Sequence, residues 1–442
     1  MVKTGAGAAG SGKSALIDLE VVSLFCGAGG LDWGFEAAGF SVSVAIDIRA
    51  DSIKSYNHNR PKKGRVAQVG DVAKLGAAEL DKLAGRTIRP IGVIGGPPCQ
   101  SFSRAAHSAE DDPRHGLPLQ FARILKELNA RSPVHFFAFE NVPGLLKEKH
   151  AARFAAMLKA FGDAGFSVFQ GLMNASAFKV PQDRPRLILV GLNRKLYPKA
   201  VWEAPKGTPK AFVSVKQAIG AFPAPRFWER GLTAADIPHH PNHWCMVPKS
   251  KNFETEGALV QGTARGRSFR TLAWLEPSPT IAYGNREVHV HPDCKRRLSV
   301  YEALRLQGFP KRFKLIGTLS SQIQQVSEAV PPPLGKAIAE SILAIVQVLT
   351  GRTSIGHADA PPPGKPARAR LSVRKALPRP SFVGADRIAG GREQPAGLGD
   401  QLVAERPIAR QQAIEVEDAC DAAGQADCRL DLRKRLGGRR SR

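Results

Sequence analysis

The feature that most constrains the fold is a series of short apolar runs, each closed by glycine, proline or an acidic residue. The first is VVSLFCGAGG, and four others occupy 42–48, 90–99, 135–144 and 185–192. Amphipathic segments lie between them, such as 150–166, where Phe154, Leu158 and Phe161 share one helical face. Apolar strands alternating with such helices predict a doubly wound, mostly parallel α/β sheet that is covered on both faces.

The alternation breaks between about 196 and 290, where prolines, single tryptophans and histidine-rich loops replace it. Helical pattern returns near 299 and again near 333. We therefore predict a flexible tail over 1–17, a first domain over 18–195, and a smaller irregular domain over 196–290. The chain then returns to the first domain over 291–350, and 351–442 form a basic, disordered tail.

Composition narrows the class of protein. The formal net charge of +25 favours a polyanionic partner such as nucleic acid, although a general arginine bias is the alternative. No run of 18 apolar residues occurs, so we expect no membrane span and no membrane partner. Six cysteines without regular spacing do not indicate a disulfide framework and favour a reducing, intracellular setting.

A glycine-rich turn follows the first apolar run, at Phe25 to Gly30. Glycines let the backbone approach a ligand, and the helix behind the turn supplies N–H groups. Asp47 ends the next run about 20 residues later, where a carboxylate can accept hydrogen bonds from ribose hydroxyls, and Asp71 could reach an adenine amino group. The pattern predicts a nucleoside-cofactor site for NAD, FAD or S-adenosylmethionine. A plain tight turn with two solvated carboxylates is the structural alternative.

Three further motifs carry reactive side chains. In GGPPCQSFS, two prolines stiffen the loop before Cys99, whose flanking Gln and Ser leave a thiolate able to react. Glu140 ends another apolar strand, and partial desolvation there makes it a candidate acid. Arg184 and Arg186 alternate along an extended segment with Gln182, so both guanidiniums could reach one anion or carbonyl.

These motifs form an ordered set that resembles the DNA (cytosine-5)-methyltransferases. The set comprises SLFCGAGGLDWGF, GGPPCQSFS, ENV, VPQDRPRLILVG, RLSVYEALRLQGFP and AVPPPL, and it extends from about 20 to 345. The resemblance implies a Rossmann-like S-adenosylmethionine-dependent methyltransferase fold, with S-adenosylmethionine as cofactor and 196–290 as the target-recognition domain. It also implies double-stranded DNA as substrate, a monomeric enzyme of the bacterial cytoplasm and nucleoid, and a cognate restriction endonuclease as functional partner.

The resemblance also implies residue roles. Cys99 would add to carbon 6 of a flipped cytosine, while Glu140 binds ring nitrogen 3 and the amino group and supplies a proton. Arg186, helped by Arg184, would hold the cytosine carbonyl and the neighbouring phosphate, and Asn141 would brace the cysteine loop. The implied cofactor contacts are Phe25, Gly27, Gly29, Asp47, Asp71, Pro98 and Leu117. The implied DNA contacts, in and after a polar segment similar to the family's catalytic loop, are Gln100, Ser101, Ser103, Arg104 and Arg114.

Two departures from the family pattern bear on function. Asp47 stands where the family usually has Glu, which is a mild change. Ser327 and Glu328 stand where it usually has Gly-Asn, and an ionised Glu only accepts hydrogen bonds. The added negative charge predicts weaker cofactor binding or an altered turn. This departure favours one alternative, a catalytically impaired DNA-binding relative; a separate alternative keeps the chemistry but takes tRNA as substrate, as a tRNA cytosine-5 methyltransferase.

Two other patterns are interpreted as incidental. Gly7, Gly12, Lys13 and Ser14 fit a P-loop, and a P-loop ATPase is one alternative function, but no strand leads into this segment, so we predict a chance match in the tail. Histidines and cysteines at 239–245 and 289–294 match no standard zinc spacing. We predict no metal site there and interpret these histidines as loop residues near nucleic acid.

Overall fold

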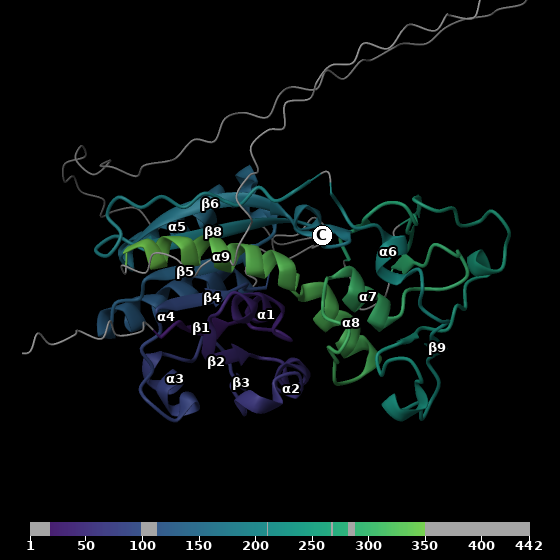
Figure 1. Cartoon of the computed structure of the whole chain (residues 1–442), viewed down its shortest axis with the longest axis horizontal. Coiled ribbons are helices and arrows are strands. Elements are labelled where there is room, and N and C mark those ends of the chain that lie inside the picture. Colours follow the sequence, from purple (N-terminus) through teal and green to yellow (C-terminus); the bar gives the residue numbers. More distant parts are fainter. Residues whose placement is uncertain (1–17, 99–112, 210, 267, 282–287, 350–442) are drawn as a thin grey trace, which may run out of the picture. The chain divides into compact units, whose positions relative to one another are not determined.

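A seven-stranded sheet forms the larger part of the molecule (Figure 1). The computed structural model describes residues 18–98, 113–209, 211–266, 268–281 and 288–349. The strand order is β3-β2-β1-β4-β5-β8-β6, and β8 is antiparallel to both neighbours while the other pairs are parallel. This arrangement confirms the predicted α/β class. The strands are β1 (Glu20–Leu24), β2 (Ser41–Asp47), β3 (Ala67–Val69), β4 (Gly92–Gly95), β5 (Phe136–Asn141), β6 (Phe166–Asn174) and β8 (Pro185–Asn193).

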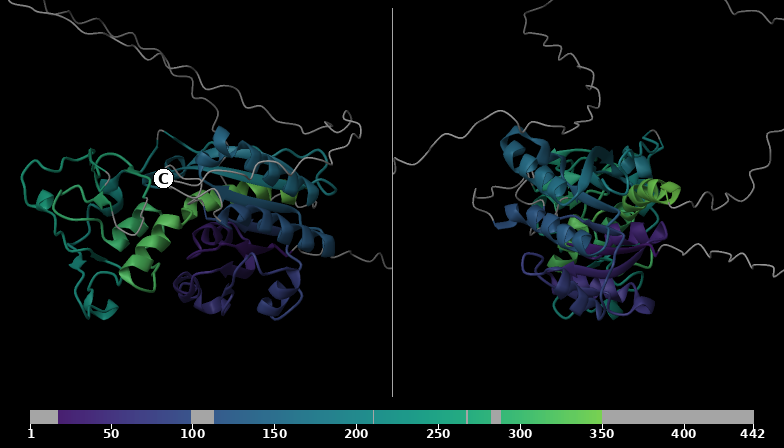
Figure 2. Two further views of the ribbon diagram at one scale, coloured as in Figure 1. Left: turned by 180° about the vertical axis from the view of Figure 1, so that it is seen from behind. Right: turned by 90° about the vertical axis from the view of Figure 1, so that its left-hand side faces the viewer.

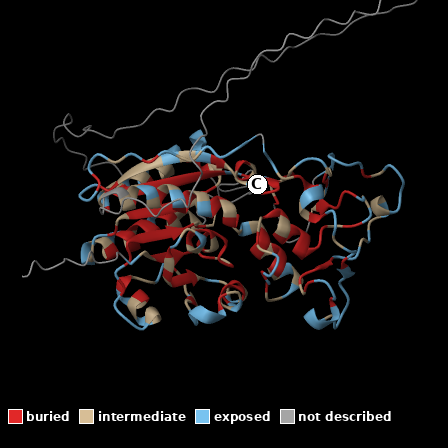
Figure 3. Cartoon of the chain, viewed as in Figure 1, coloured by how far each residue is buried: buried red, intermediate tan, exposed pale blue. Residues whose placement is uncertain are grey.

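Helices cover both faces of the sheet, and Figure 2 shows the arrangement from behind and from one side. On one face, a core that includes Phe35, Tyr56 and Ile338 joins the strands to α1 (Gly30–Ala37), α2 (Ala50–His58) and α9 (Pro332–Leu349). On the other, Phe121 and Phe161 belong to a second core with α3 (Ala77–Ala84), α4 (Leu117–Arg131) and α5 (Ala151–Asp163). In Figure 3 the strands are mostly buried between these helices. Each face is therefore closed by apolar packing, as the sequence predicts.

α9 packs against α1 at very short range. A Cβ on Gly30 would lie 2.2 Å from the Val330 carbonyl oxygen, and one on Gly34 would lie 2.4 Å from the Lys336 nitrogen. Gly34 is therefore required by the helix crossing, and Gly30 by the close approach of the chain just before α9. By length and composition alone, the stretch Leu319–Gln347 could cross a membrane, but half of its most apolar window is buried inside the protein. Its apolarity is explained by this packing.

A second group of elements has a core of its own, which includes Val215, Trp244, Leu304 and Ile323. We call residues 211–328 the second lobe, and the rest of the described chain the sheet lobe. The helices of the second lobe are α6 (Val215–Ile219), α7 (Val300–Leu306) and α8 (Leu319–Glu328). Its strands have only two or three residues: β9 (Arg226–Phe227), β10 (Trp244–Cys245), β11 (Ala264–Arg265), β12 (Phe269–Thr271), β13 (Ser278–Pro279) and β14 (His289–Val290).

The second lobe, 211–328, does not coincide with the irregular domain predicted over 196–290. Tyr197 and Trp202, placed in that domain by the sequence, belong to the core of the sheet lobe. α7 and α8, placed in the returning segment, share the core of the second lobe, and β7 (Gln182–Asp183) pairs with β13. The remaining short elements are the 3-10 helices Pro61–Lys63, Pro113–Gly116, Pro143–Leu146, Glu148–His150, Ala175–Phe178, Ala234–Asp236 and Lys251–Phe253.

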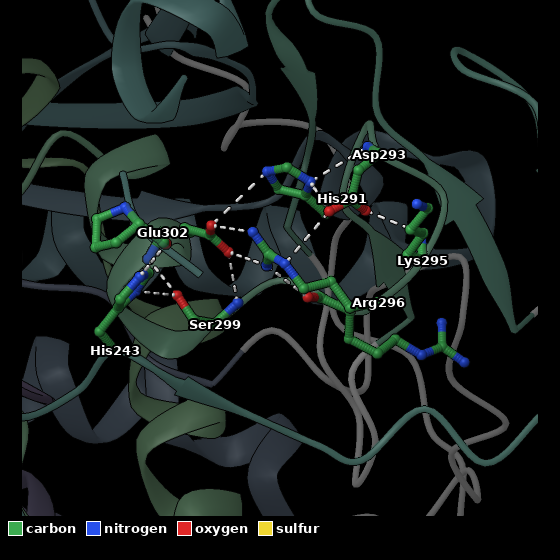
Figure 4. A network of polar contacts seen from close by, with 9 residues as sticks. His243, His291, Asp293, Lys295, Arg296, Ser299 and Glu302 are labelled. Carbon is green, nitrogen blue, oxygen red and sulfur yellow. Dashed lines mark hydrogen bonds and ion pairs between the residues drawn. The ribbon is translucent and has the colours of Figure 1, made fainter. Parts of the chain in front are cut away.

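A buried polar network holds the second lobe together (Figure 4). Both Arg296 terminal nitrogens bind the Glu302 carboxylate, at 2.9 and 2.8 Å, and the Ser299 backbone N–H donates to the same group at 2.8 Å. Glu302 is fully buried. His291 binds Asp293 at 3.0 Å on the same loop. The network connects the loop before α7 to the first turn of that helix.

Two histidines of this lobe were interpreted as loop residues near nucleic acid, but the structure buries both of them. His243 is buried and its ring nitrogens contact the Ser299 hydroxyl at 2.9 Å and the Pro223 carbonyl at 2.8 Å. His240 stacks on Tyr301 with ring centroids 3.9 Å apart, and burial lowers its pKa to about 4. Among the described residues, no group of three or more His, Cys, Asp or Glu side chains is arranged to hold a metal ion. These two histidines are core residues.

Candidate active site

The predicted motifs meet at one edge of the sheet. β1 and β4 are neighbours in the sheet. The strand that follows β1, β2, lies on one side of this pair, and the strand that follows β4, β5, lies on the other side. Ligands of doubly wound sheets bind at the carboxyl ends of strands beside such a switch point. The glycine-rich turn follows β1 here, and Gly96, Pro97 and Pro98 follow β4. The topology thus brings the two loops that the sequence singles out to the same edge.

The glycine-rich turn has three residues in the left-handed region. Their φ angles are +57° at Phe25, +54° at Gly27 and +86° at Gly29. Such a φ is uncommon for a residue with a side chain, and strained backbone gathers at ligand sites. A Cβ on Gly29 would lie 2.6 Å from the Tyr56 ring, whereas one on Gly27 would meet nothing within 4 Å. Gly29 therefore permits packing, and Gly27 leaves its backbone open to a ligand.

Asp47 is fixed against this turn. Its carboxylate accepts hydrogen bonds from the N–H of Gly27 and the N–H of Arg49, each at 2.9 Å. Burial raises the pKa of Asp47, while these two hydrogen bonds and the Arg49 charge oppose the rise. A carboxylate has about four acceptor positions, so two are left for hydroxyl donors. Asp71 lies past β3 and accepts from the Ala73 N–H at 3.0 Å, which closes a local turn.

Two exposed apolar side chains flank these carboxylates, and sequence reasoning missed them. Ile48 follows Asp47 at the end of β2 and is 67% exposed; Val69 ends β3 and is 54% exposed. Both lie at the carboxyl ends of paired strands, as the register joins Asp47 to Val69. Apolar surface beside hydroxyl acceptors suits a nucleoside, which has a flat base and a polar sugar. The alternation rule could have found Ile48, because it continues an apolar run past the strand end.

The residues present therefore fit S-adenosylmethionine. Asp47 offers free acceptor positions, the backbone at Gly27 is open, and apolar side chains lie alongside. Pro98 and Leu117, the other expected contacts within the described chain, are half-buried at the end of β4 and at the start of α4. Both are thus partly accessible.

Glu140 and Arg186 form an ion pair at the end of β5. The Arg186 Nε lies 2.7 Å from the Glu140 carboxylate, and the two side chains are only 9% and 12% exposed. A Cβ on Gly96 would lie 2.8 Å from the same carboxylate, so the glycine of the GGPPC motif makes room for it. Glu140 therefore has a cationic partner, which the expectation of a simply desolvated carboxyl left out.

Asn141 reaches the beginning of the cysteine loop. Its side-chain amide donates to the Pro97 carbonyl at 3.4 Å, and its side-chain oxygen accepts from the Val142 N–H at 2.9 Å. This contact supports the expected bracing role. Arg114 lies in the 3-10 helix before α4. The remaining expected residues fall outside the described part of the chain: Cys99, Gln100, Ser101, Ser103 and Arg104, together with the P-loop-like segment.

Arg184 and Arg186 point the same way but have different partners in the described chain. Gln182, Arg184 and Arg186 are buried while the residues between them are exposed, as the alternation predicts. The Arg184 guanidinium donates to the carbonyls of Ser327 and Ala329, at 2.9 and 3.0 Å. It therefore fastens the α8–α9 junction to β7 and β8, whereas Arg186 binds Glu140. The expectation that both guanidiniums reach one anion overlooked these backbone acceptors, which come from distant sequence.

Glu328 has a partner that the sequence did not reveal. It is the last residue of α8, and its carboxylate forms a two-point ion pair with the Arg49 guanidinium, with Nη2 2.9 Å from Oε1. The negative charge expected to weaken cofactor binding is thus compensated by a cation that immediately follows the cofactor edge of β2.

Comparisons with known proteins agree on one family. Residues 19–344 match the family described as C-5 cytosine-specific DNA methylase. Type II methyltransferase M.NmeDI of Neisseria meningitidis serogroup C is 31% identical over 74% of this chain and 84% of the relative. Type II methyltransferase M.MthTI of Methanothermobacter thermautotrophicus is also 31% identical, over 74% and 97%. A solved structure described as a DNA modification methyltransferase encoded within an E. coli prophage superposes with a TM-score of 0.62, at 25% identity over 74% and 99%.

Proposed function

This chain belongs to the C-5 cytosine-specific DNA methylase family and is a DNA (cytosine-5)-methyltransferase, and we propose how its own residues carry out that reaction. The observation that carries the proposal is the meeting of Glu140, Arg186 and Asn141 at the end of β5, beside the turn that leads to Cys99. A thiol, an acid and a guanidinium are the groups needed to activate a cytosine ring.

We assign the substrate chemistry to three residues, Cys99, Glu140 and Arg186, and a positioning role to Arg184. The Cys99 thiolate forms a bond to carbon 6 of a flipped cytosine, which makes carbon 5 nucleophilic. Glu140 binds ring nitrogen 3 and the amino group and supplies the proton, and Arg186 orients both Glu140 and the cytosine carbonyl. After methyl transfer, the carbon 5 proton is released to solvent, the Cys99 sulfur departs as thiolate, and ring nitrogen 3 returns its proton to Glu140, which restores the neutral ring. Arg184 acts by positioning, because its guanidinium holds the α8–α9 junction.

The proposed cofactor is S-adenosylmethionine, which when bound supplies an electrophilic methyl group. Asp47 accepts hydrogen bonds from the ribose hydroxyls, Ile48 and Val69 contact the adenine ring, and Asp71 accepts from its amino group. Phe25, Gly27 and Gly29 hold the methionine end against the backbone of the turn. The switch-point topology and the open acceptor positions of Asp47 support this placement.

The proposed setting is double-stranded DNA in a bacterial cytoplasm, with the enzyme acting as a monomer on one short sequence. The base must leave the duplex, at a cost of a few kcal/mol, before the thiol can reach carbon 6. Gln100, Ser101, Ser103, Arg104 and Arg114 are proposed to contact the DNA, and residues 196–290 to read its sequence. A cognate restriction endonuclease is the proposed functional partner, as the type II methyltransferases among the relatives suggest.

Transfer of labelled methyl groups tests the proposal. Purified wild-type protein is expected to label duplex DNA, and Cys99→Ser is expected to lose all labelling while still binding cofactor by calorimetry. Labelling of tRNA in preference to DNA would favour the tRNA alternative, and DNA binding without any transfer would favour the impaired relative. In a separate experiment, bisulfite sequencing of DNA from expressing cells tests activity and reads the target sequence together.

A further inference from the structure

Arg49 connects two carboxylates with different roles. Its backbone N–H is bound to Asp47, while its guanidinium is bound to Glu328 on α8. Because residue 49 lies only two positions after residue 47, its long side chain can also fold back onto the Asp47 carboxylate. A guanidinium with five donors would then occupy the acceptor positions that a ribose needs.

Stability alone explains the Glu328–Arg49 pair poorly. The two side chains are 39% and 34% exposed, and pairs of this kind contribute only about 0–1 kcal/mol. Glu328 is also the last residue of its helix, where the macrodipole disfavours a negative charge. A neutral residue would suit the helix end better, so the pair calls for an explanation outside α8.

The backbone around Glu328 is firmly held. Arg184 donates to the carbonyls of Ser327 and Ala329, the residues on either side of it, from a buried position. The Gln324 side-chain amide also donates to the Glu328 carboxylate, at 3.2 Å. Glu328 is therefore a fixed anchor for the guanidinium, rather than a side chain that follows Arg49.

We propose that Glu328 is a positioning residue for cofactor binding: it holds the Arg49 guanidinium away from Asp47 and so keeps the Asp47 carboxylate open to ribose hydroxyls. The inference rests on the proposed role of Asp47. On this inference, the departure at residues 327–328 does not impair cofactor binding. Instead, Arg49 at the cofactor edge requires Glu328 at the α8–α9 junction.

Calorimetric titration of the full chain with S-adenosylhomocysteine tests the inference through binding, without turnover. Glu328→Gln is expected to weaken binding about 10-fold, which is about 1.4 kcal/mol, because the released guanidinium competes for Asp47. The double variant Arg49→Gln/Glu328→Gln is expected to regain wild-type affinity within about twofold. A simple brace between α2 and α8 predicts the opposite, since the double variant would then bind at least as weakly as Glu328→Gln.

A second ligand separates positioning from general damage. A 2′,3′-dideoxy analogue of S-adenosylhomocysteine lacks the hydroxyls that Asp47 would bind, so its affinity should be the same in wild type and Glu328→Gln. Equal weakening for both ligands, or no weakening of either, would overturn the inference. Failure of the wild type to bind S-adenosylhomocysteine, or full binding by Asp47→Asn, would instead refute the proposed cofactor site itself.

Discussion

The two lobes place polar side chains by different means. In the sheet lobe, β4 and the first part of β5 are apolar, and Asp47 and Glu140 stand at the carboxyl ends of their strands. In the second lobe the strands have two or three residues, and a buried network around Glu302 joins the loops to a helix. The difference teaches that polar groups at the sheet edge can be dedicated to chemistry, whereas those inside the second lobe maintain the fold.

The largest expected effect is on activity in the sheet lobe. Glu140→Gln should lower methyl transfer to DNA by about two to four orders of magnitude, because the proton donor to the cytosine ring is lost. The free energy of unfolding should also fall, by about 3–5 kcal/mol, because Arg186 stays charged and buried without its counter-ion, so activity is compared per folded molecule. Labelling assays and urea denaturation measure the two quantities. If Glu140→Gln lost stability but kept its activity per folded molecule, the assignment of Glu140 to the chemistry would be contradicted.

The next effect is on stability in the second lobe. Glu302→Gln should lower the free energy of unfolding by about 3–5 kcal/mol, because Arg296 remains charged and buried without its counter-ion. The matched control is Asp163→Asn, which removes the exposed Lys159 pair and should leave the free energy of unfolding nearly unchanged. Urea denaturation compares them. Equal losses in both variants would contradict a structural role for the Glu302 network.

A smaller effect is expected at Asp32, where a buried carboxyl of the sheet lobe costs stability. Burial raises its pKa from 3.8 to about 6. Between about pH 4 and 6 the unfolded chain loses this proton while the folded chain keeps it, so the contribution of Asp32 to stability falls as the pH rises. Asp32→Asn removes the penalty and should add up to about 3 kcal/mol at pH 7, with little change at pH 4.

Urea denaturation of wild type and Asp32→Asn from pH 4 to 8 measures this difference. The Asn side chain keeps an oxygen for the Ser23 hydroxyl, which binds Asp32 at 2.7 Å. A difference between the two proteins that does not grow with pH would show that the carboxyl is solvated in solution.

The smallest pair of effects concerns backbone contact in the sheet lobe. Gly34→Ala should destabilise by about 1–3 kcal/mol, because its Cβ would lie 2.4 Å from the Lys336 nitrogen of α9. Gly162→Ala in α5 is the control: the nearest atom to its Cβ is 3.9 Å away, so alanine should stabilise by about 0.5–1 kcal/mol. Thermal unfolding of both checks the opposite signs.

The features that could be predicted from the sequence are those set by local signals. The strands β1, β2, β4, β5 and β8, the helices α1, α4 and α5, and the strand-end positions of Asp47 and Glu140 follow from apolar runs and their punctuation, which are local signals. β6 was missed because it is an edge strand whose residues are only partly buried, so it has no apolar run. The position of β6 in the sheet depends on its pairing with β8, and local sequence signals do not reveal that pairing.

Interactions between distant residues were the other gap. Neither Arg184 with Ser327 nor Arg49 with Glu328 can be inferred from spacing, because each joins segments more than 100 residues apart through a single side chain. The burial of His243 was missed for a related reason: its partner Ser299 belongs to the cap of α7, far along the chain. Composition made the loop look exposed, while tertiary contacts bury it.

Because α9 packs on α1, the sheet lobe can be completed only late in translation. α1 leaves the ribosome early, but the helix that covers its glycine face begins only at residue 332. Translation proceeds at about 5–20 residues per second, so the interval between β8 and α9 lasts on the order of 10 s. During that time one face of the nascent sheet has α1 and α2 but lacks α9, and the sheet lobe cannot be completed until the second lobe has been made.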